Sequence, residues 1–109
     1  MLKSKYRLLR GEKAKPREIS STPFFILKSA ENDSSSRFAF AVSKKVDKRA
    51  VIRNRVRRKV RGCIEKNILN IKPGYNFIFI IKKEAIDAKE DDICQSIYKE
   101  LDKKGFLIK

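Results

Sequence analysis

The stretch from Phe40 to Arg61 reads FAVSKKVDKRAVIRNRVRRKVR, and it contains two structural signals in succession. Its first residues belong to a segment, residues 38–43, in which large and small side chains alternate as in a strand with two different faces. From about Lys48 to Asn67 the apolar residues instead recur at helical spacing, within an arc of about 120°. We expect Asp47 to cap the start of this helix. The stretch therefore predicts a strand that leads into a long amphipathic helix.

This helix has an apolar stripe on one side and a basic face on the other. The stripe consists of Ile52, Val56, Val60, Cys63 and Ile64. The basic face consists of Asn54, Arg55, Arg57, Arg58 and Arg61. Arg53 and Lys59 flank the stripe, and we expect their long side chains to carry the charge outward. An ordinary solvated helix face mixes charges of both signs, because like charges three or four residues apart repel, so this face indicates an anionic partner.

Arginine dominates the basic residues of the helix, and this narrows the choice of anionic partner. A guanidinium group binds phosphate through two hydrogen bonds and stacks on bases, which a lysine ammonium group cannot do. A helix that lies on a membrane surface needs large exposed apolar side chains, whereas a stripe of Ile, Val and Cys is typical of a protein core. The pattern favours nucleic acid over a membrane.

The chain has 109 residues and a formal net charge of +15, which is concentrated in two segments. Residues 1–17, a basic N-terminal arm, contribute +6, and residues 44–61 contribute +9. The length predicts one domain, residues 1–109, without a second core, and its charge predicts that this domain binds nucleic acid. The absence of His removes the commonest general base and the commonest zinc ligand. No secretory signal and no bilayer-spanning apolar run is visible, so we expect a cytoplasmic protein.

Three further elements are predicted outside the opening stretch. Residues 24–27 form an apolar run of strand length, and residues 75–81 form a second one with little alternation between its faces. Residues 88–104 repeat apolar side chains at helical spacing. Residues 20–23 are expected to be a break, and the polar link at residues 31–36 is expected to join the strands beside it as a β-hairpin.

The order of these elements predicts an α+β fold. We expect a small two-layer α/β sandwich, with one mixed sheet of about four strands and two main helices. The strand, helix and strand between residues 38 and 81 predict a crossover between parallel strands, for which a right-handed connection is the default.

A few acidic and sulfur-containing residues offer other chemistry. Glu90, Asp91 and Asp92 begin the second helix, where acidic side chains ordinarily compensate the helix dipole, so a divalent-ion site is less favoured. Cys63 and Cys94 fall on apolar helix faces, where one disulfide is conceivable but small core residues are the favoured interpretation. No Ser, Cys or Lys has a visible partner base that would activate it as a nucleophile. We therefore expect no catalytic residue and no metal ligand in the chain itself.

The opening stretch resembles the signature of the bacterial ribonuclease P protein family. The resemblance rests on the strand end at residues 40–46, followed by a helix that carries Arg53, Asn54 and Arg55, paired basic residues and Arg61. It implies a small α/β sandwich like a domain of ribosomal proteins, with a left-handed β-α-β crossover in place of the default hand. It also implies an accessory subunit of a ribonucleoprotein endonuclease, whose RNA is the catalyst and binds Mg²⁺. That enzyme removes the 5′ leader from precursor tRNA.

The resemblance assigns residues to two RNA-binding surfaces. The catalytic RNA would be contacted by Lys44, Lys45, Arg49, Arg53, Asn54, Arg55, Arg57, Arg58 and Arg61. The single-stranded leader would lie in a cleft between the N-terminal helix and the sheet, near Tyr6, Lys28, Ala39, Ala41 and Ser43. A sheet position that often carries Tyr in the family is Lys28 here, so we expect electrostatics to contribute more than stacking.

Other functions remain open from the residues alone. A ribosomal or general RNA-binding protein of similar fold would use the same basic helix without a processing role. A DNA-binding or membrane-binding module would bind duplex DNA or anionic vesicles in competition with RNA. The main prediction is a ribonuclease P protein subunit whose partners are the catalytic RNA and precursor tRNA, with no membrane and no obligate protein partner.

Overall fold

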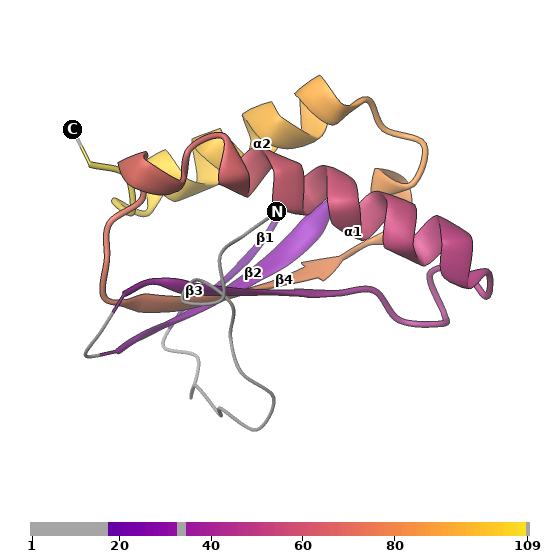
Figure 1. Cartoon of the computed structure of the whole chain (residues 1–109), viewed down its shortest axis with the longest axis horizontal. Coiled ribbons are helices and arrows are strands. Elements are labelled where there is room, and N and C mark those ends of the chain that lie inside the picture. Colours follow the sequence, from indigo (N-terminus) through magenta and orange to yellow (C-terminus); the bar gives the residue numbers. More distant parts are fainter. Residues whose placement is uncertain (1–17, 33–34, 109) are drawn as a thin grey trace.

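The computed structural model describes residues 18–32 and 35–108, which form one sheet covered by two helices. The strands are β1 (Glu18–Ser21), β2 (Phe25–Glu31), β3 (Arg37–Ala41) and β4 (Tyr75–Ile81). The helices are α1 (Ala50–Glu65) and α2 (Glu90–Lys103), with single 3-10 turns at Ile68–Asn70 and Lys83–Ala85. Both helices lie on the same face of the sheet (Figure 1). The predicted two-layer α+β sandwich is therefore confirmed.

The strand order is β1-β2-β4-β3, so β4 lies inside the sheet. It pairs antiparallel with β2 and parallel with β3, which makes α1 the crossover between two parallel strands, as the sequence predicts. The predicted hairpin between residues 24–27 and 38–43 is wrong, because β4 lies between these two strands. β4 ends in the apolar run at residues 77–81, and its backbone pairs with a neighbouring strand on each side.

The hairpin of this sheet is formed instead by β1 and β2, which turn at Thr22 and Pro23. The Thr22 hydroxyl accepts hydrogen bonds from the amides of Phe24 and Phe25 at 3.2 and 3.1 Å, and the Thr22 amide donates to the Phe25 carbonyl at 2.8 Å. The sequence predicts only a break here, since the serines of β1 have little strand propensity. Pairing with β2 overrides that weak local preference.

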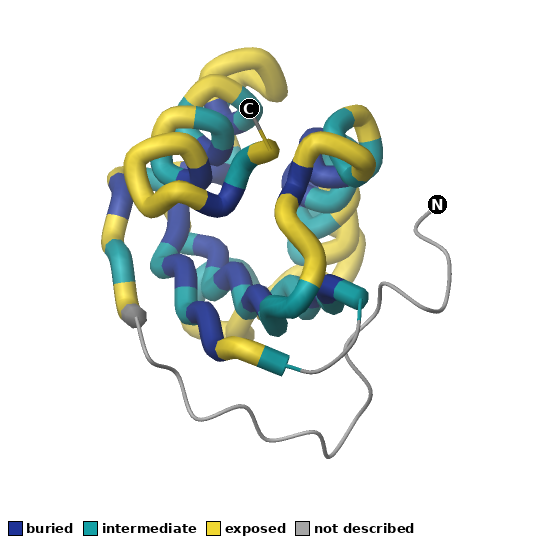
Figure 2. Tube along the Cα trace, turned by 90° about the vertical axis from the view of Figure 1, so that its left-hand side faces the viewer, coloured by how far each residue is buried: buried dark blue, intermediate teal, exposed yellow. Residues whose placement is uncertain are grey.

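The core lies between the sheet and the two helices (Figure 2). Phe77 and Phe79 of β4 are fully buried, and β3 stacks Phe38 and Phe40 on them with ring centroids 5.3 and 5.6 Å apart. The helices contribute Val56, Val60, Cys63, Ile64, Ile93, Ile97 and Leu101. Both predicted apolar stripes are thereby confirmed, with Ile52 half-buried at the edge. Among the helices of the described residues, none combines the length and apolarity that crossing a bilayer requires.

The start of α1 differs from the expectation that Asp47 caps it. The helix begins at Ala50, its N-cap residue is Arg49, and no side chain caps it. Asp47 lies two residues before the N-cap, where its Oδ1 accepts the Arg49 amide at 2.8 Å. The carboxylate therefore closes a local turn in the loop instead of reaching the amides of the first helical turn.

The two helices are joined by a disulfide between Cys63 on α1 and Cys94 on α2, whose Cα atoms are 5.2 Å apart. Cys63 lies in the core and Cys94 packs against it, as predicted, and the disulfide that the sequence left as conceivable is present. Helical periodicity places each cysteine on an apolar face, but only the packing of α1 against α2 brings the two sulfurs together.

Candidate nucleic-acid interface

The basic face of α1 points away from the buried stripe and into solvent. Arg55 and Arg58 are exposed, while Arg57 and Arg61 are half-buried at its margins. Nη1 of Arg57 donates to Oδ1 of Asn54 at 2.8 Å, which orients both side chains. Within residues 18–32 and 35–108, no hydrogen bond or ion pair holds Arg55, Arg58 or Arg61. Their guanidinium groups are therefore available to an external anion.

The loop before α1 is fixed by bonds around Asp47. Arg49 donates to both carboxylate oxygens, from Nε at 3.1 Å and from Nη2 at 2.9 Å. These side-chain bonds, with the bond from the Arg49 amide, lower the pKa of Asp47 from 3.8 to about 2. The side-chain bonds and the negative charge of Asp47 raise the pKa of Arg49. Arg53 Nη1 donates to the carbonyl oxygens of Asp47 and Lys48 at 3.0 and 2.8 Å. Arg53 therefore turns back onto the loop, which corrects the expectation that its charge reaches outward.

Lys59 also departs from the expectation that its charge reaches outward. Its Nζ donates to the carbonyl oxygens of Ile86 and Ala88 at 3.2 and 3.3 Å, in the segment that leads into α2. That segment offers two acceptors that helical spacing alone cannot reveal. Lys59 therefore joins α1 to the start of α2 and is not part of the basic face.

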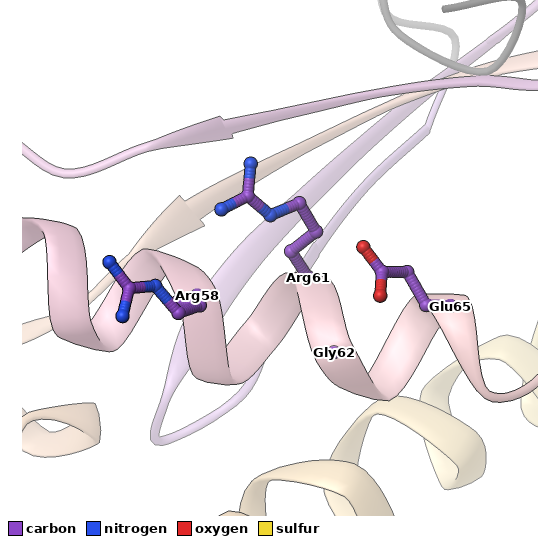
Figure 3. A pocket seen from close by; sticks show the side chains of 4 residues that line it. All are labelled: Arg58, Arg61, Gly62 and Glu65. Carbon is purple, nitrogen blue, oxygen red and sulfur yellow. The ribbon is translucent and has the colours of Figure 1, made fainter. Parts of the chain in front are cut away.

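The basic surface continues beyond both ends of this face. Before the helix, Lys44, Lys45 and Arg49 are all exposed. Towards the end of the helix, Arg58 and Arg61 line a surface hollow of about 310 Å³ together with Gly62 and Glu65 (Figure 3). Two guanidinium groups beside one hollow suit a phosphate, which accepts hydrogen bonds from both. Among the nine residues predicted to contact the catalytic RNA, contacts within the described part of the chain hold Arg53 to two carbonyl groups and Arg49 to the Asp47 carboxylate.

A second surface lies on the sheet face opposite the helices. Lys28, Ile78 and Ala39 are register partners on β2, β4 and β3, so they form one row across this face. Ile26, Ile80 and Ala41 form the next row. Three of the predicted leader-binding residues, Lys28, Ala39 and Ala41, therefore share one face. Ser43 is exposed two residues beyond β3, and Tyr6 lies outside the described residues.

The burial of β4 also corrects the expectation that this strand is buried with little alternation. Phe77, Phe79 and Ile81 are buried under the helices, whereas Ile78 and Ile80 are only half-buried on the other side. Sequence reasoning missed both isoleucines as surface residues, because an apolar run does not reveal which face is covered. It also missed Arg37, which the period of two places on the face that contains Ala39 and Ala41.

Comparison with known proteins gives a consistent result. The family model described as Ribonuclease P matches residues 4–105. The Ribonuclease P protein component of Clostridioides difficile strain 630 is 48% identical over 63 residues, which cover 57% of this chain and 54% of that protein. The corresponding protein of Microcystis aeruginosa is 35% identical over 72 residues, 66% of this chain and 60% of that protein. The chain spans 54 to 60% of the length of these two curated relatives.

Solved structures show the same fold. The RNase P protein of Staphylococcus aureus superposes with a TM-score of 0.72 at 22% identity, covering 98% of this chain and 95% of that one. The RNase P protein of Thermotoga maritima superposes with a TM-score of 0.70 at 20% identity, covering 77% of this chain and 80% of that one. The sheet and the two helices of this chain therefore have counterparts of the same arrangement.

Proposed function

The chain belongs to the ribonuclease P protein family, and from that premise we propose that it is the protein subunit of a ribonuclease P. In this proposal it binds the catalytic RNA and precursor tRNA, and the ribonucleoprotein removes the 5′ leader. The RNA supplies the catalytic site and holds the Mg²⁺, and the protein supplies no catalytic residue.

The observation that carries the proposal is the one-sided charge of α1 within this family's signature stretch. Arg55, Arg58 and Arg61 are held by no described partner, so each is free to bind RNA phosphates. The catalytic RNA and the precursor tRNA are both polyanions and repel each other. A protein with a net charge of +15 reduces that repulsion, and its contribution is largest where little Mg²⁺ is present to do the same.

We also propose that the single-stranded leader binds the sheet face opposite the helices. Lys28 and Arg37 supply positive charge there, and Ile78 and Ile80 supply apolar surface beside Lys28. Small residues on β3, Ala39 and Ala41, leave room for the leader's bases to approach the sheet. Binding would rest on phosphate contacts and apolar contact with the bases, since no aromatic side chain lies in these rows within the described strands.

The proposal is tested by cleavage of a precursor tRNA at low Mg²⁺ with a bacterial ribonuclease P RNA, with and without this protein. We expect the protein to restore cleavage at the leader junction and to show no cleavage on its own. Tight binding to the RNA without any restoration would contradict the proposal and would favour a ribosomal or general RNA-binding role.

A pair of matched variants assigns the effect to α1. Arg55→Ala/Arg58→Ala removes two charges from the basic face, and Lys99→Ala/Lys103→Ala removes two charges from exposed positions on α2. We expect Arg55→Ala/Arg58→Ala to restore cleavage only at a protein concentration at least about tenfold higher than the wild type needs. We expect Lys99→Ala/Lys103→Ala to act like the wild type. Equal losses from both variants would show that only net charge matters.

The leader site has its own test. Lys28→Ala is expected to weaken binding of precursor tRNA severalfold while leaving binding of mature tRNA, which has no leader, unchanged. Lys72→Ala, which removes an exposed lysine outside the sheet, is the control. A Lys28 variant that weakens binding of both RNAs alike would place the leader elsewhere.

A further inference from the structure

The seam between α1 and α2 contains three side chains of metal-binding type that the proposed function does not use. They are Cys63 on α1 and Glu90 and Cys94 on α2, and their ligand atoms lie within 4.8 Å of one another. Glu90 and Cys94 are four residues apart in one helix, so they project from the same face, and that face meets Cys63. Cys63 is 2% exposed, Cys94 is half-buried and Glu90 is exposed, so the cluster opens from the core to solvent.

Glu90 lies back against α1 instead of extending into solvent. Its Oε1 is 3.6 Å from Nζ of Lys66, and it would be 3.5 Å from a Cβ placed on Gly62. Because Gly62 has no side chain, the carboxylate rests beside the backbone that carries Cys63. The main-chain oxygen of Glu90 is 4.0 Å from the Cys63 sulfur, which places the first turn of α2 directly over this cysteine.

We propose that Cys63, Cys94 and Glu90 bind a Zn²⁺ ion when the disulfide is reduced. A dithiol reductant transfers two electrons and two protons to the two sulfurs and is itself oxidised to a disulfide. Binding of Zn²⁺ then releases the two thiol protons to solvent. Two thiolates and one carboxylate supply three ligands of a tetrahedral ion, and a water molecule on the exposed side supplies the fourth.

The chemistry of the cluster selects zinc among divalent ions. Thiolates are soft ligands that favour Zn²⁺ over Mg²⁺ or Ca²⁺. Two thiolates and a carboxylate carry one more negative charge than Zn²⁺ neutralises, and the Lys66 ammonium group balances it. Two sulfurs on one zinc ion lie about 3.7 Å apart, given Zn–S bonds of about 2.3 Å. Side-chain rotation reaches that spacing from Cα atoms 5.2 Å apart without moving the helices.

The consequence for the proposed RNA-binding helix is that α1 stays fixed to α2 in either redox state. Under oxidising conditions the disulfide joins the helices, and under the reducing conditions of a cytoplasm the zinc ion does. This inference does not rest on the proposed function, and its test does not use RNA cleavage.

The test uses the full-length protein, reduced with a phosphine that does not bind zinc, and titrates Zn²⁺ against a chromophoric chelator. We expect one Zn²⁺ per reduced chain, none in the oxidised protein, and none in Cys63→Ser/Cys94→Ser. Co²⁺ in place of Zn²⁺ should give a thiolate charge-transfer band, which reports on the sulfur ligands directly. Far-UV circular dichroism checks that each variant is folded.

Two variants that replace an acidic residue with its amide test the role of Glu90 in the zinc site. Glu90→Gln is expected to lower Zn²⁺ affinity at least about tenfold, and Asp91→Asn, which neutralises the exposed neighbouring acid, to leave it unchanged. Reduced protein that binds Zn²⁺ no more tightly than the double serine variant would overturn the proposal. Equal affinities for Glu90→Gln and the wild type, or equal losses from both acidic variants, would overturn the role of Glu90 as a ligand.

Discussion

α1 and α2 pack side by side on the same sheet face and bury similar apolar stripes, yet their exposed charges follow different rules. α2 has Glu90, Asp91 and Asp92 in its first turn and Lys103 in its last, an arrangement that stabilises the helix dipole. α1 has no acidic residue in its first turn and no basic residue in its last, and its arginines repel one another along the helix. The charges of α2 stabilise the helix itself, whereas those of α1 repel one another and are explained by binding to an external anion.

The ends of the two helices differ in the same way. α2 ends in a Schellman motif, in which the amides of Gly105 and Phe106 donate to Asp102 and Leu101 at 3.0 and 2.8 Å. α1 begins without a side-chain cap and depends on neighbours: the loop around Asp47, the bonds of Lys59 and the link from Cys63. The exposed residues of α1 are proposed to bind RNA, and the helix is therefore stabilised by its contacts with the rest of the fold.

The largest expected effect is the salt dependence of RNA binding. About six phosphate contacts by α1 and its preceding loop predict that affinity falls about a thousandfold between 50 and 200 mM salt. Arg55→Ala/Arg58→Ala should reduce the logarithmic slope by about two, while Lys99→Ala/Lys103→Ala should not change it. Fluorescence anisotropy with ribonuclease P RNA at several salt concentrations measures both slopes. A shallow slope for the wild type would remove the electrostatic role assigned to α1.

Adjacent residues of α1 allow a sharper contrast between binding and stability. Lys59→Met leaves two carbonyl groups without their donor and should lower the free energy of unfolding by about 1 to 2 kcal/mol, with little change in RNA affinity. Arg58→Met should weaken RNA binding and leave the free energy of unfolding nearly unchanged, because no described partner holds Arg58. Urea unfolding and anisotropy on both variants give the comparison. If the two variants changed stability and RNA affinity to the same extent, Lys59 and Arg58 would not have the separate structural and RNA-binding roles assigned to them.

These contrasts also show what the sequence could predict. Helical periodicity identified both faces of α1, because a residue's place on a helix depends only on its spacing. The resemblance grouped Lys28, Ala39 and Ala41 at one surface, and the register of β2, β4 and β3 places them on one face of the sheet. The family signature predicts that the basic helix binds RNA, and the two-layer α+β sandwich that it implies is the one observed.

The errors share a different physical cause, which is dependence on contacts between distant segments. The hairpin of residues 24–27 with 38–43 failed because β4, much later in the chain, pairs between them. Lys59 finds its acceptors 27 and 29 residues away, and Cys63 finds Cys94 31 residues away. No local pattern encodes such partners, since they depend on how α1 and α2 are set against each other.

The C-terminal end of α2 gives a smaller effect. Gly105 has φ of 77°, in the left-handed region that disfavours residues with a Cβ. Gly105→Ala is therefore expected to lower the free energy of unfolding by about 1 kcal/mol, although nothing lies within 4 Å of the added Cβ. Thermal unfolding measures this cost, and RNA affinity should stay unchanged because α2 lies outside the proposed interface. A change in affinity without a change in stability would contradict the division between the helices.

The smallest expected effect tests the loop that holds the start of α1. Because Arg49 lowers the pKa of Asp47 from 3.8 to about 2, the folded state binds this proton less readily than the unfolded state. The stabilisation is therefore complete above pH 4 and is lost as the pH falls through 2. Asp47→Asn should flatten the pH dependence of stability in that window, whereas Asp87→Asn, in the loop before α2, should not. Hydrogen exchange should also rise in the first turn of α1 alone; an equal rise in α2 would show that the loop acts on the whole fold.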